Sequence, residues 1–178
     1  DRYAAQDPRI HVIHQENQGQ GVARNAALDR CTGAWIAFVD SDDWIDPDTY
    51  MTMLAFAAEK DLDCVYCAAR IVRGEDDHEI RFREYPDRTV KPAREILRRV
   101  LEDEIGGQPC KAIYKRGCWE KVRFPAGMKY EDLAISWLPF THTTGKVGFL
   151  EAPFYHYRMN PEGTSLGNDP RKYGDIFE

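Results

Sequence analysis

In the stretch Trp35-Ile-Ala-Phe-Val-Asp-Ser-Asp-Asp-Trp44, an apolar run changes abruptly into an acidic one. Residues 36–39 are apolar, and three carboxylates follow them, Asp40, Asp42 and Asp43. Four consecutive apolar residues between polar ones are typical of a strand that is covered on both faces. Because ligands bind at the carboxyl ends of strands in open α/β sheets, this stretch predicts a strand that leads into a ligand site.

The three carboxylates repel one another unless a positive partner lies between them. A divalent cation held by oxygen ligands is the simplest partner, and Mg²⁺ bound in this way usually also contacts a phosphate. The alternative is a solvated acidic turn before the next helix, because Asp46-Pro47 has the pattern of an N-cap followed by proline. The spacing alone leaves both interpretations open.

The remaining sequence alternates between strand and helix patterns. Strands are expected at residues 10–13, 35–39, 63–73, 79–84, 111–115, 146–150 and 154–159, with a turn at 74–78. Helices are expected at residues 22–30, 48–60, 92–104, 116–122 and 131–140. This alternation predicts an α/β domain at 1–159 with a mixed, mainly parallel sheet flanked by helices, and a loop-like tail at 160–178.

Composition excludes several classes of protein. The net charge of −6 argues against a general nucleic-acid binder, which needs a basic surface. No apolar run reaches the roughly 20 residues that span a bilayer. The five cysteines are an odd number, which favours a reducing compartment over a disulfide framework. Cys64 and Cys67 have no second ligand pair for zinc, so they are predicted to lie in the core.

Six motifs, in one order along the chain, resemble family 2 glycosyltransferases. They are Gly21-Val-Ala-Arg-Asn25 with Gly33, Ile36-Ala-Phe-Val-Asp-Ser-Asp-Asp43, Lys111-Ala-Ile-Tyr-Lys115, Phe124-Pro, Tyr130-Glu-Asp132 and Pro153-Phe-Tyr-His-Tyr-Arg158. The resemblance implies the GT-A fold and transfer of a sugar, with inversion, from a nucleotide-activated donor. The family normally opens with an apolar strand and an acidic segment that binds the base. Both would precede Asp1, so we expect a sheet without its first strands and an incomplete nucleotide pocket.

The same resemblance assigns the acidic turn to the donor. Asp42 is expected to bind Mn²⁺ or Mg²⁺, which would bridge the diphosphate and stabilise the charge on the leaving oxygen. Asp43 is the candidate second ligand, and Asp40 is expected to contact the ribose or orient the turn.

Basic and amide side chains are expected to border the donor phosphates. Arg24 and Asn25 lie in the first turns of the helix predicted at 22–30, where backbone N–H groups and a bidentate guanidinium suit phosphate. The alternative for Arg24 is an ion pair with a local acid. Arg158, on the last predicted strand, is expected to neutralise the diphosphate, with a surface ion pair as the alternative.

The motif Tyr130-Glu-Asp132 opens a predicted helix and matches the family's acidic pair. The resemblance implies that Asp132 is the general base that takes the acceptor proton. It also implies that Glu131 binds an acceptor hydroxyl or supports the base. The alternative is helix capping, because acids in a first turn interact favourably with the helix dipole.

We therefore expect a metal-dependent inverting glycosyltransferase of bacterial surface polysaccharide assembly. Its partners would be a nucleotide-sugar donor and a glycan or lipid-linked acceptor, with no nucleic acid. The resemblance to the family implies a cytoplasmic enzyme that associates peripherally with the inner face of the membrane. Strand edges left open by the missing first strands would allow self-association. The alternatives are a non-catalytic or degenerate nucleotide-sugar or glycan-binding domain and, less favoured, a glycoside hydrolase with paired carboxylates.

Overall fold

The computed structural model describes residues 1–73, 78–81, 85–102, 104, 106 and 108–159. The predicted tail at 160–178 and most of the predicted turn at 74–78 lie outside these residues. Among the described helices, none has the length and apolar character needed to cross a membrane.

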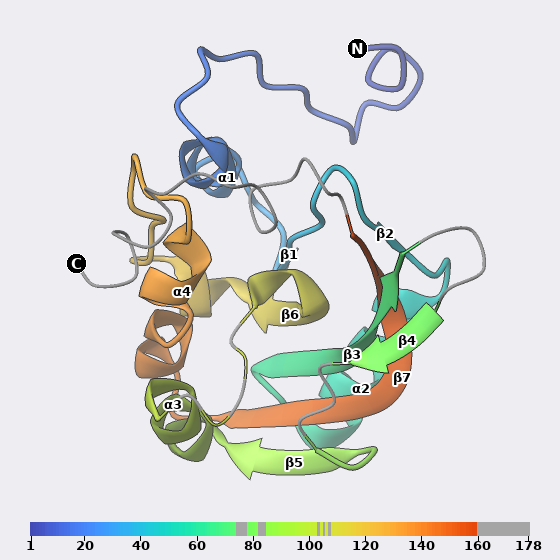
Figure 1. The fold of residues 1–178 in the computed structure, drawn as a ribbon, viewed down its shortest axis with the longest axis vertical. Coiled ribbons are helices and arrows are strands. Elements are labelled where there is room, and N and C mark those ends of the chain that lie inside the picture. The colour runs from blue at the N-terminus through green and yellow to red at the C-terminus, as the bar shows by residue number, and fades with distance from the viewer. Residues whose placement is uncertain (74–77, 82–84, 103, 105, 107, 160–178) are drawn as a thin grey trace.

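The described part of the chain combines helices with strands that follow one another singly or in groups (Figure 1). The helices are α1 Gln20–Leu28, α2 Thr49–Lys60, α3 Ala93–Leu101 and α4 Glu131–Ile135, with 3₁₀ turns η1 Pro109–Lys111, η2 Arg116–Trp119 and η3 Leu138–His142. The strands are β1 Trp35–Ala37, β2 Trp44–Ile45, β3 Cys64–Val72, β4 His78–Arg81, β5 Thr89–Pro92, β6 Ala112–Lys115 and β7 Lys146–Arg158. The helices predicted at 22–30, 48–60 and 92–104 are confirmed as α1, α2 and α3 with shifted ends.

One mixed sheet joins the strands in the order β1-β6-β3-β7-β2, with β4 paired to β3 and β5 paired to β7. The α/β class with a mixed sheet is confirmed, but the expectation of mainly parallel pairing is wrong. Within the described part of the chain, only β3 and β7 pair in parallel. The reason is the insertion of β6, which runs antiparallel to both β1 and β3 and separates these two strands of common direction.

The two strands predicted at 146–150 and 154–159 form one strand, β7. On β7, Tyr155 lies five positions after Leu150, whereas their partners on β3, Ala69 and Cys67, are only two positions apart. A bulge of this kind re-aims the residues that follow it. Pro153 lies within the bulge, where its missing N–H breaks no ladder hydrogen bond.

Three local expectations at the start of the chain are wrong. Residues 10–13 form no strand, and no described strand pairs with them. The strand expected at 35–39 ends at residue 37 and lies at the edge of the described sheet. It is not covered on both faces, because Ile36 is buried whereas Ala37 is exposed, and Val39 beyond its end is 45% exposed. Asp46 does not cap α2, because the helix begins at Thr49, and the Asp46 carboxylate lies 2.9 Å from His156 Nε2.

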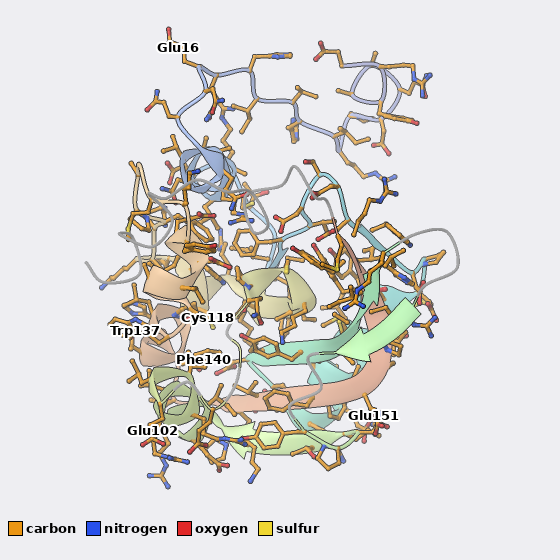
Figure 2. All side chains as sticks on the ribbon, viewed as in Figure 1. Glu16, Glu102, Cys118, Trp137, Phe140 and Glu151 are labelled. Carbon is orange, nitrogen blue, oxygen red and sulfur yellow. The ribbon has the colours of Figure 1, made fainter. Side chains whose placement is uncertain are left out.

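Two clusters of buried side chains pack on opposite faces of the sheet. Along β3, Cys64 and Tyr66 belong to the cluster formed with α3, η2 and η3, whereas Val65 and Cys67 belong to the cluster under α2. This alternation follows the period of a strand that is buried on both sides. In Figure 2 the labelled Cys118 and Phe140 lie among the buried side chains, and Glu102 lies on the outside.

All five cysteines are free thiols in the structure. Cys64, Cys67 and Cys118 are buried, as the sequence predicts for core cysteines, whereas Cys31 is exposed.

Candidate active site

Arg24 joins two segments that lie far apart in the sequence. From α1, its guanidinium donates to Asp40 Oδ1 at 2.5 Å and to Glu131 Oε1 at 2.6 Å. The same group lies over the Phe124 ring, 5.2 Å from the ring centroid. The Arg24 side chain is only 14% exposed, so the acidic turn and the start of α4 meet around a largely buried cation.

Glu131 opens α4 and is 0% exposed. Burial raises the pKa of its carboxyl, the nearby charge of Asp132 adds to this effect, and the charge of Arg24 opposes it. The close approach of α1 depends on Gly21, since a Cβ there would lie 3.0 Å from Glu131 Cγ and 3.1 Å from the Pro125 carbonyl oxygen. Glycine at this position therefore permits the contact between α1 and the Glu131 side chain.

Asp132 follows in the first turn of α4 and is partly buried. Burial raises the pKa of its carboxyl, and the charge of Asp40 raises it further, while the Leu133 amide and Arg24 lower it. The Asp132 carboxylate accepts a 2.9 Å hydrogen bond from the Leu133 amide in the same helix. A carboxylate with a raised pKa is a stronger base, and the bond to Leu133 is also compatible with capping.

The acidic turn follows β1 and is closed by a 3.1 Å bond from the Asp43 amide to the Asp40 carbonyl. Asp43 accepts hydrogen bonds from the Tyr155 hydroxyl at 2.6 Å and from the Arg158 amide at 2.8 Å. Burial raises the pKa of the Asp43 carboxyl, and these two hydrogen bonds lower it. Asp42 is exposed, so the three acids of the turn lie in different environments.

The described residues contain no group of three or more His, Cys, Asp or Glu side chains arranged to hold a metal ion. Mg²⁺ is usually bound by one or two carboxylates together with substrate phosphates, rather than by a cage of protein ligands. The exposed carboxylate of Asp42, within the turn that the Asp43–Asp40 backbone bond closes, fits that kind of site.

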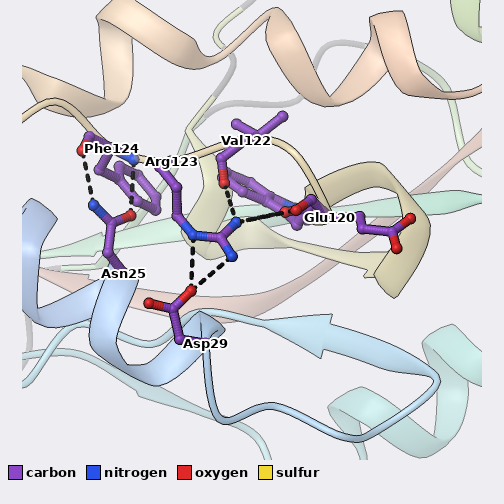
Figure 3. A network of polar contacts seen from close by, with 7 residues as sticks. Asn25, Asp29, Glu120, Val122, Arg123 and Phe124 are labelled. Atoms are coloured by element: carbon purple, nitrogen blue, oxygen red, sulfur yellow. Dashed lines mark hydrogen bonds and ion pairs between the residues drawn. The ribbon is translucent and has the colours of Figure 1, made fainter.

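The other two predicted donor residues are engaged within the chain. Asn25 donates its amide to the Phe124 carbonyl at 2.8 Å and accepts from the Phe124 amide at 2.9 Å. Figure 3 shows this pair beside Arg123, which bonds to Asp29 of the segment that follows α1. The Arg158 guanidinium lies over the Trp44 ring, 5.1 Å from its centroid, at the exposed end of β7.

Two residues that shape the site, Tyr155 and Gly21, have no role in the sequence-based predictions. Tyr155 lies in the motif at 153–158, but only the folded chain places its hydroxyl against the acidic turn. Gly21 starts the motif at 21–25, and its contact with Glu131 depends on a helix 110 positions further along the chain. A glycine inside a helix pattern is the signal that indicates such a close approach.

Residues 1–123 match the family described as Glycosyl transferase family 2, and the chain belongs to this family. It is 43% identical over 169 residues to the uncharacterized glycosyltransferase YibD of Escherichia coli (strain K12). It is 34% identical over 166 residues to the putative glycosyltransferase EpsH of Bacillus subtilis (strain 168). These matches cover 92% and 90% of this chain but 49% and 47% of the two relatives, so the chain spans about half of their length.

Solved structures confirm the fold class. The crystal structure of Staphylococcus aureus TarS 1–349 in complex with UDP-GlcNAc matches with a TM-score of 0.70 and 20% sequence identity. The match covers 92% of this chain and 46% of that structure. The fold is therefore of the GT-A type, as the motif order predicts.

Proposed function

We propose that this protein transfers a sugar, with inversion, from a nucleotide-diphosphate donor to an acceptor hydroxyl. The observation that carries the proposal is the Arg24 bridge, since one guanidinium contacts Asp40 at 2.5 Å and Glu131 at 2.6 Å. Donor activation and acceptor activation must occur within a few ångströms of each other. The Arg24 bridge brings together the acidic turn, which is suited to donor activation, and the start of α4, which is suited to acceptor activation.

On the donor side, the acidic turn and Arg158 receive the diphosphate. Asp42 would hold Mn²⁺ or Mg²⁺, and the ion would supply positive charge where the leaving diphosphate becomes more negative. Asp40 orients the turn through Arg24, and the Arg158 guanidinium lies at its exposed edge over Trp44. Asn25 supports this side indirectly, because its amide fixes the Phe124 segment on which Arg24 packs.

On the acceptor side, Asp132 is the general base. The acceptor oxygen attacks the anomeric carbon, its proton passes to the Asp132 carboxylate, and the bond from that carbon to the diphosphate oxygen breaks. A single displacement of this kind inverts the anomeric configuration. The raised pKa of Asp132 supports the role, because a carboxylate that is costly to ionise accepts a proton more readily. Glu131, held by Arg24, binds an acceptor hydroxyl or supports Asp132.

The names of two relatives support the biosynthetic role that we propose. They are a putative teichuronic acid biosynthesis glycosyltransferase of Bacillus subtilis (strain 168), 45% identical over 60 residues, and a chondroitin synthase of Escherichia coli, 40% identical over 67 residues. We propose a role in bacterial surface polysaccharide assembly at the cytoplasmic face of the membrane. The acceptor would be a growing glycan or a lipid-linked sugar, reached through peripheral association with the membrane.

The substitution Asp132→Asn in the full-length protein tests the base. Asparagine keeps the size of the side chain and removes its basicity, so the transfer rate should fall roughly 10²- to 10⁴-fold, with donor affinity nearly unchanged. Rate, donor binding and melting temperature are measured on one preparation. Glu95→Gln is the matched control, because Glu95 lies in the first turn of α3 and pairs with Lys91 outside the site. A near-normal rate with a lowered melting temperature would show that Asp132 only caps α4.

A further inference from the structure

Tyr155 contacts both ends of the acidic turn. Its side chain is 1% exposed, and its hydroxyl donates to Asp43 Oδ2 at 2.6 Å. The same oxygen accepts from the Asp40 amide at 3.3 Å. One buried hydroxyl therefore bonds the first acid of the turn through the backbone and the last acid through its carboxylate.

The second oxygen of Asp43 is also held by β7. The Arg158 amide donates to Asp43 Oδ1 at 2.8 Å, three positions after Tyr155. Both oxygens of this partly buried carboxylate therefore accept a hydrogen bond from the chain, and hydrogen bonds to a charged group contribute more to stability than those between neutral groups. Asp40, in turn, is bonded to Arg24, which leaves Asp42 as the acid of the turn that is exposed to a ligand.

The bulge in β7 places the Tyr155 side chain on the required face. Leu150 and Tyr155 are five positions apart, which would put them on opposite faces of a regular strand. Their partners on β3, Cys67 and Ala69, are two positions apart and share a face. All four side chains belong to the same buried cluster, so the bulge turns Tyr155 back toward that cluster and the acidic turn.

We propose that Tyr155 is a positioning residue for the donor site, and that Asp43 acts through it. The turn clamp, consisting of the Tyr155 hydroxyl, the Asp43 carboxylate and the Asp40 amide, holds residues 40–43 so that Asp42 is the acid of the turn that would hold the metal ion. Asp43 thereby shapes the turn, in place of the second metal-ligand role that the sequence indicates. This inference rests on the proposed function, because it assigns parts within the same donor site.

The test compares Tyr155→Phe with Tyr157→Phe in the full-length protein. Tyr157 lies two positions further along β7, and no hydrogen bond joins its hydroxyl to the described residues of the turn. Hydrogen exchange of the Asp40 and Asp43 amides is measured without ligand, and Mn²⁺-dependent binding of uridine diphosphate is measured by calorimetry. Loss of a hydrogen bond to a charged group should speed exchange in Tyr155→Phe about 10- to 100-fold and weaken binding by a similar factor. Tyr157→Phe should change neither quantity.

Two acidic variants separate the clamp from direct ligation. Asp43→Asn should speed the same amides, and the double variant with Tyr155→Phe should bind no more weakly than the single variants, since both remove one interaction. Asp42→Asn should weaken binding and leave exchange unchanged. Asp43→Asn also tests the clamp without any change to the buried tyrosine, and so keeps the test valid if Tyr155→Phe folds poorly.

Each outcome has one meaning. Exchange in Tyr155→Phe equal to that in Tyr157→Phe overturns the clamp. Faster exchange with unchanged affinity for Mn²⁺ and uridine diphosphate overturns its role in positioning the donor. The third outcome is faster amide exchange in Tyr155→Phe while the unsubstituted protein binds no uridine diphosphate. That result supports the clamp as a structural feature of the turn and contradicts the proposed donor site.

Discussion

Replacement of Arg24 by methionine should be among the most destabilising single changes in this site. Methionine keeps an unbranched apolar side chain but leaves Glu131, which is 0% exposed, without its cationic partner. Removal of one partner from a buried ion pair costs about 3–5 kcal/mol. The loss at Asp40 adds less, because that side chain is 31% exposed and water replaces the contact. For a chain of this size, the melting temperature should fall by roughly 6–20 °C.

The defect should depend on pH in a defined direction. Burial raises the pKa of Glu131 and Arg24 lowers it, so Arg24→Met should raise this pKa further. A carboxyl with a raised pKa in the folded state costs stability when it is ionised, and the cost disappears as pH falls through that pKa. Arg24→Met should therefore be more destabilised at pH 8 than at pH 5. Glu131→Gln should rescue part of the loss in the double variant, because it removes the unpaired charge.

Urea unfolding of the four proteins of this cycle, at both pH values, measures the coupling directly. Arg98→Met is the matched control, since Arg98 forms an exposed pair with Glu102 on α3 and should cost less than about 1 kcal/mol. A cost for Arg24→Met no larger than that of Arg98→Met, or the absence of coupling to Glu131, would refute the idea of a buried bridge.

Two further substitutions test the metal and the helix contact. Asp42→Asn should weaken Mn²⁺-dependent diphosphate binding by about 1–3 kcal/mol, as measured by calorimetry. Treatment of the unsubstituted protein with EDTA should remove that binding. Equal affinities of Asp42→Asn and the unsubstituted protein would exclude Asp42 from the site. Gly21→Ala should cost about 1–3 kcal/mol in thermal unfolding, because its Cβ would lie 3.1 Å from the Pro125 carbonyl oxygen and 3.0 Å from Glu131 Cγ. Gly117→Ala, where no atom lies within 4 Å of the added carbon, should cost clearly less, and equal costs would contradict the packing argument.

Local patterns predict the elements of this fold better than they predict its sheet. The helices α1, α2 and α3 and the strand β3 lie where periodicity and turn residues predict them, because these signals depend on neighbours in the sequence. Pairing depends on partners from elsewhere in the chain. The antiparallel insertion of β6 between β1 and β3, and the fusion of two predicted strands into β7, carry no local signal.

In the candidate site, too, the sequence predicts the residues better than it predicts their long-range contacts. The order of the motifs identifies the family and indicates Asp40, Asp42 and Asp132 as site residues, although their roles remain predictions. What the sequence does not predict is how the chain uses its own polar groups. Asn25 bonds to the Phe124 backbone and Tyr155 bonds to the turn, and neither partner is a sequence neighbour.

The dependence of the turn on β7 has a consequence for biosynthesis. Tyr155 and Arg158 lie 112 and 115 positions after Asp43, and Glu131 lies 107 positions after Arg24. Contacts between such distant positions form slowly, and a chain is synthesised from its N-terminus. A nascent chain that stops before Tyr155 thus contains every acid of the site and none of the hydroxyl bonding that shapes the turn. The acidic turn is therefore synthesised early, whereas its hydrogen bonds with Tyr155 and Arg158 form only after β7 has emerged from the ribosome.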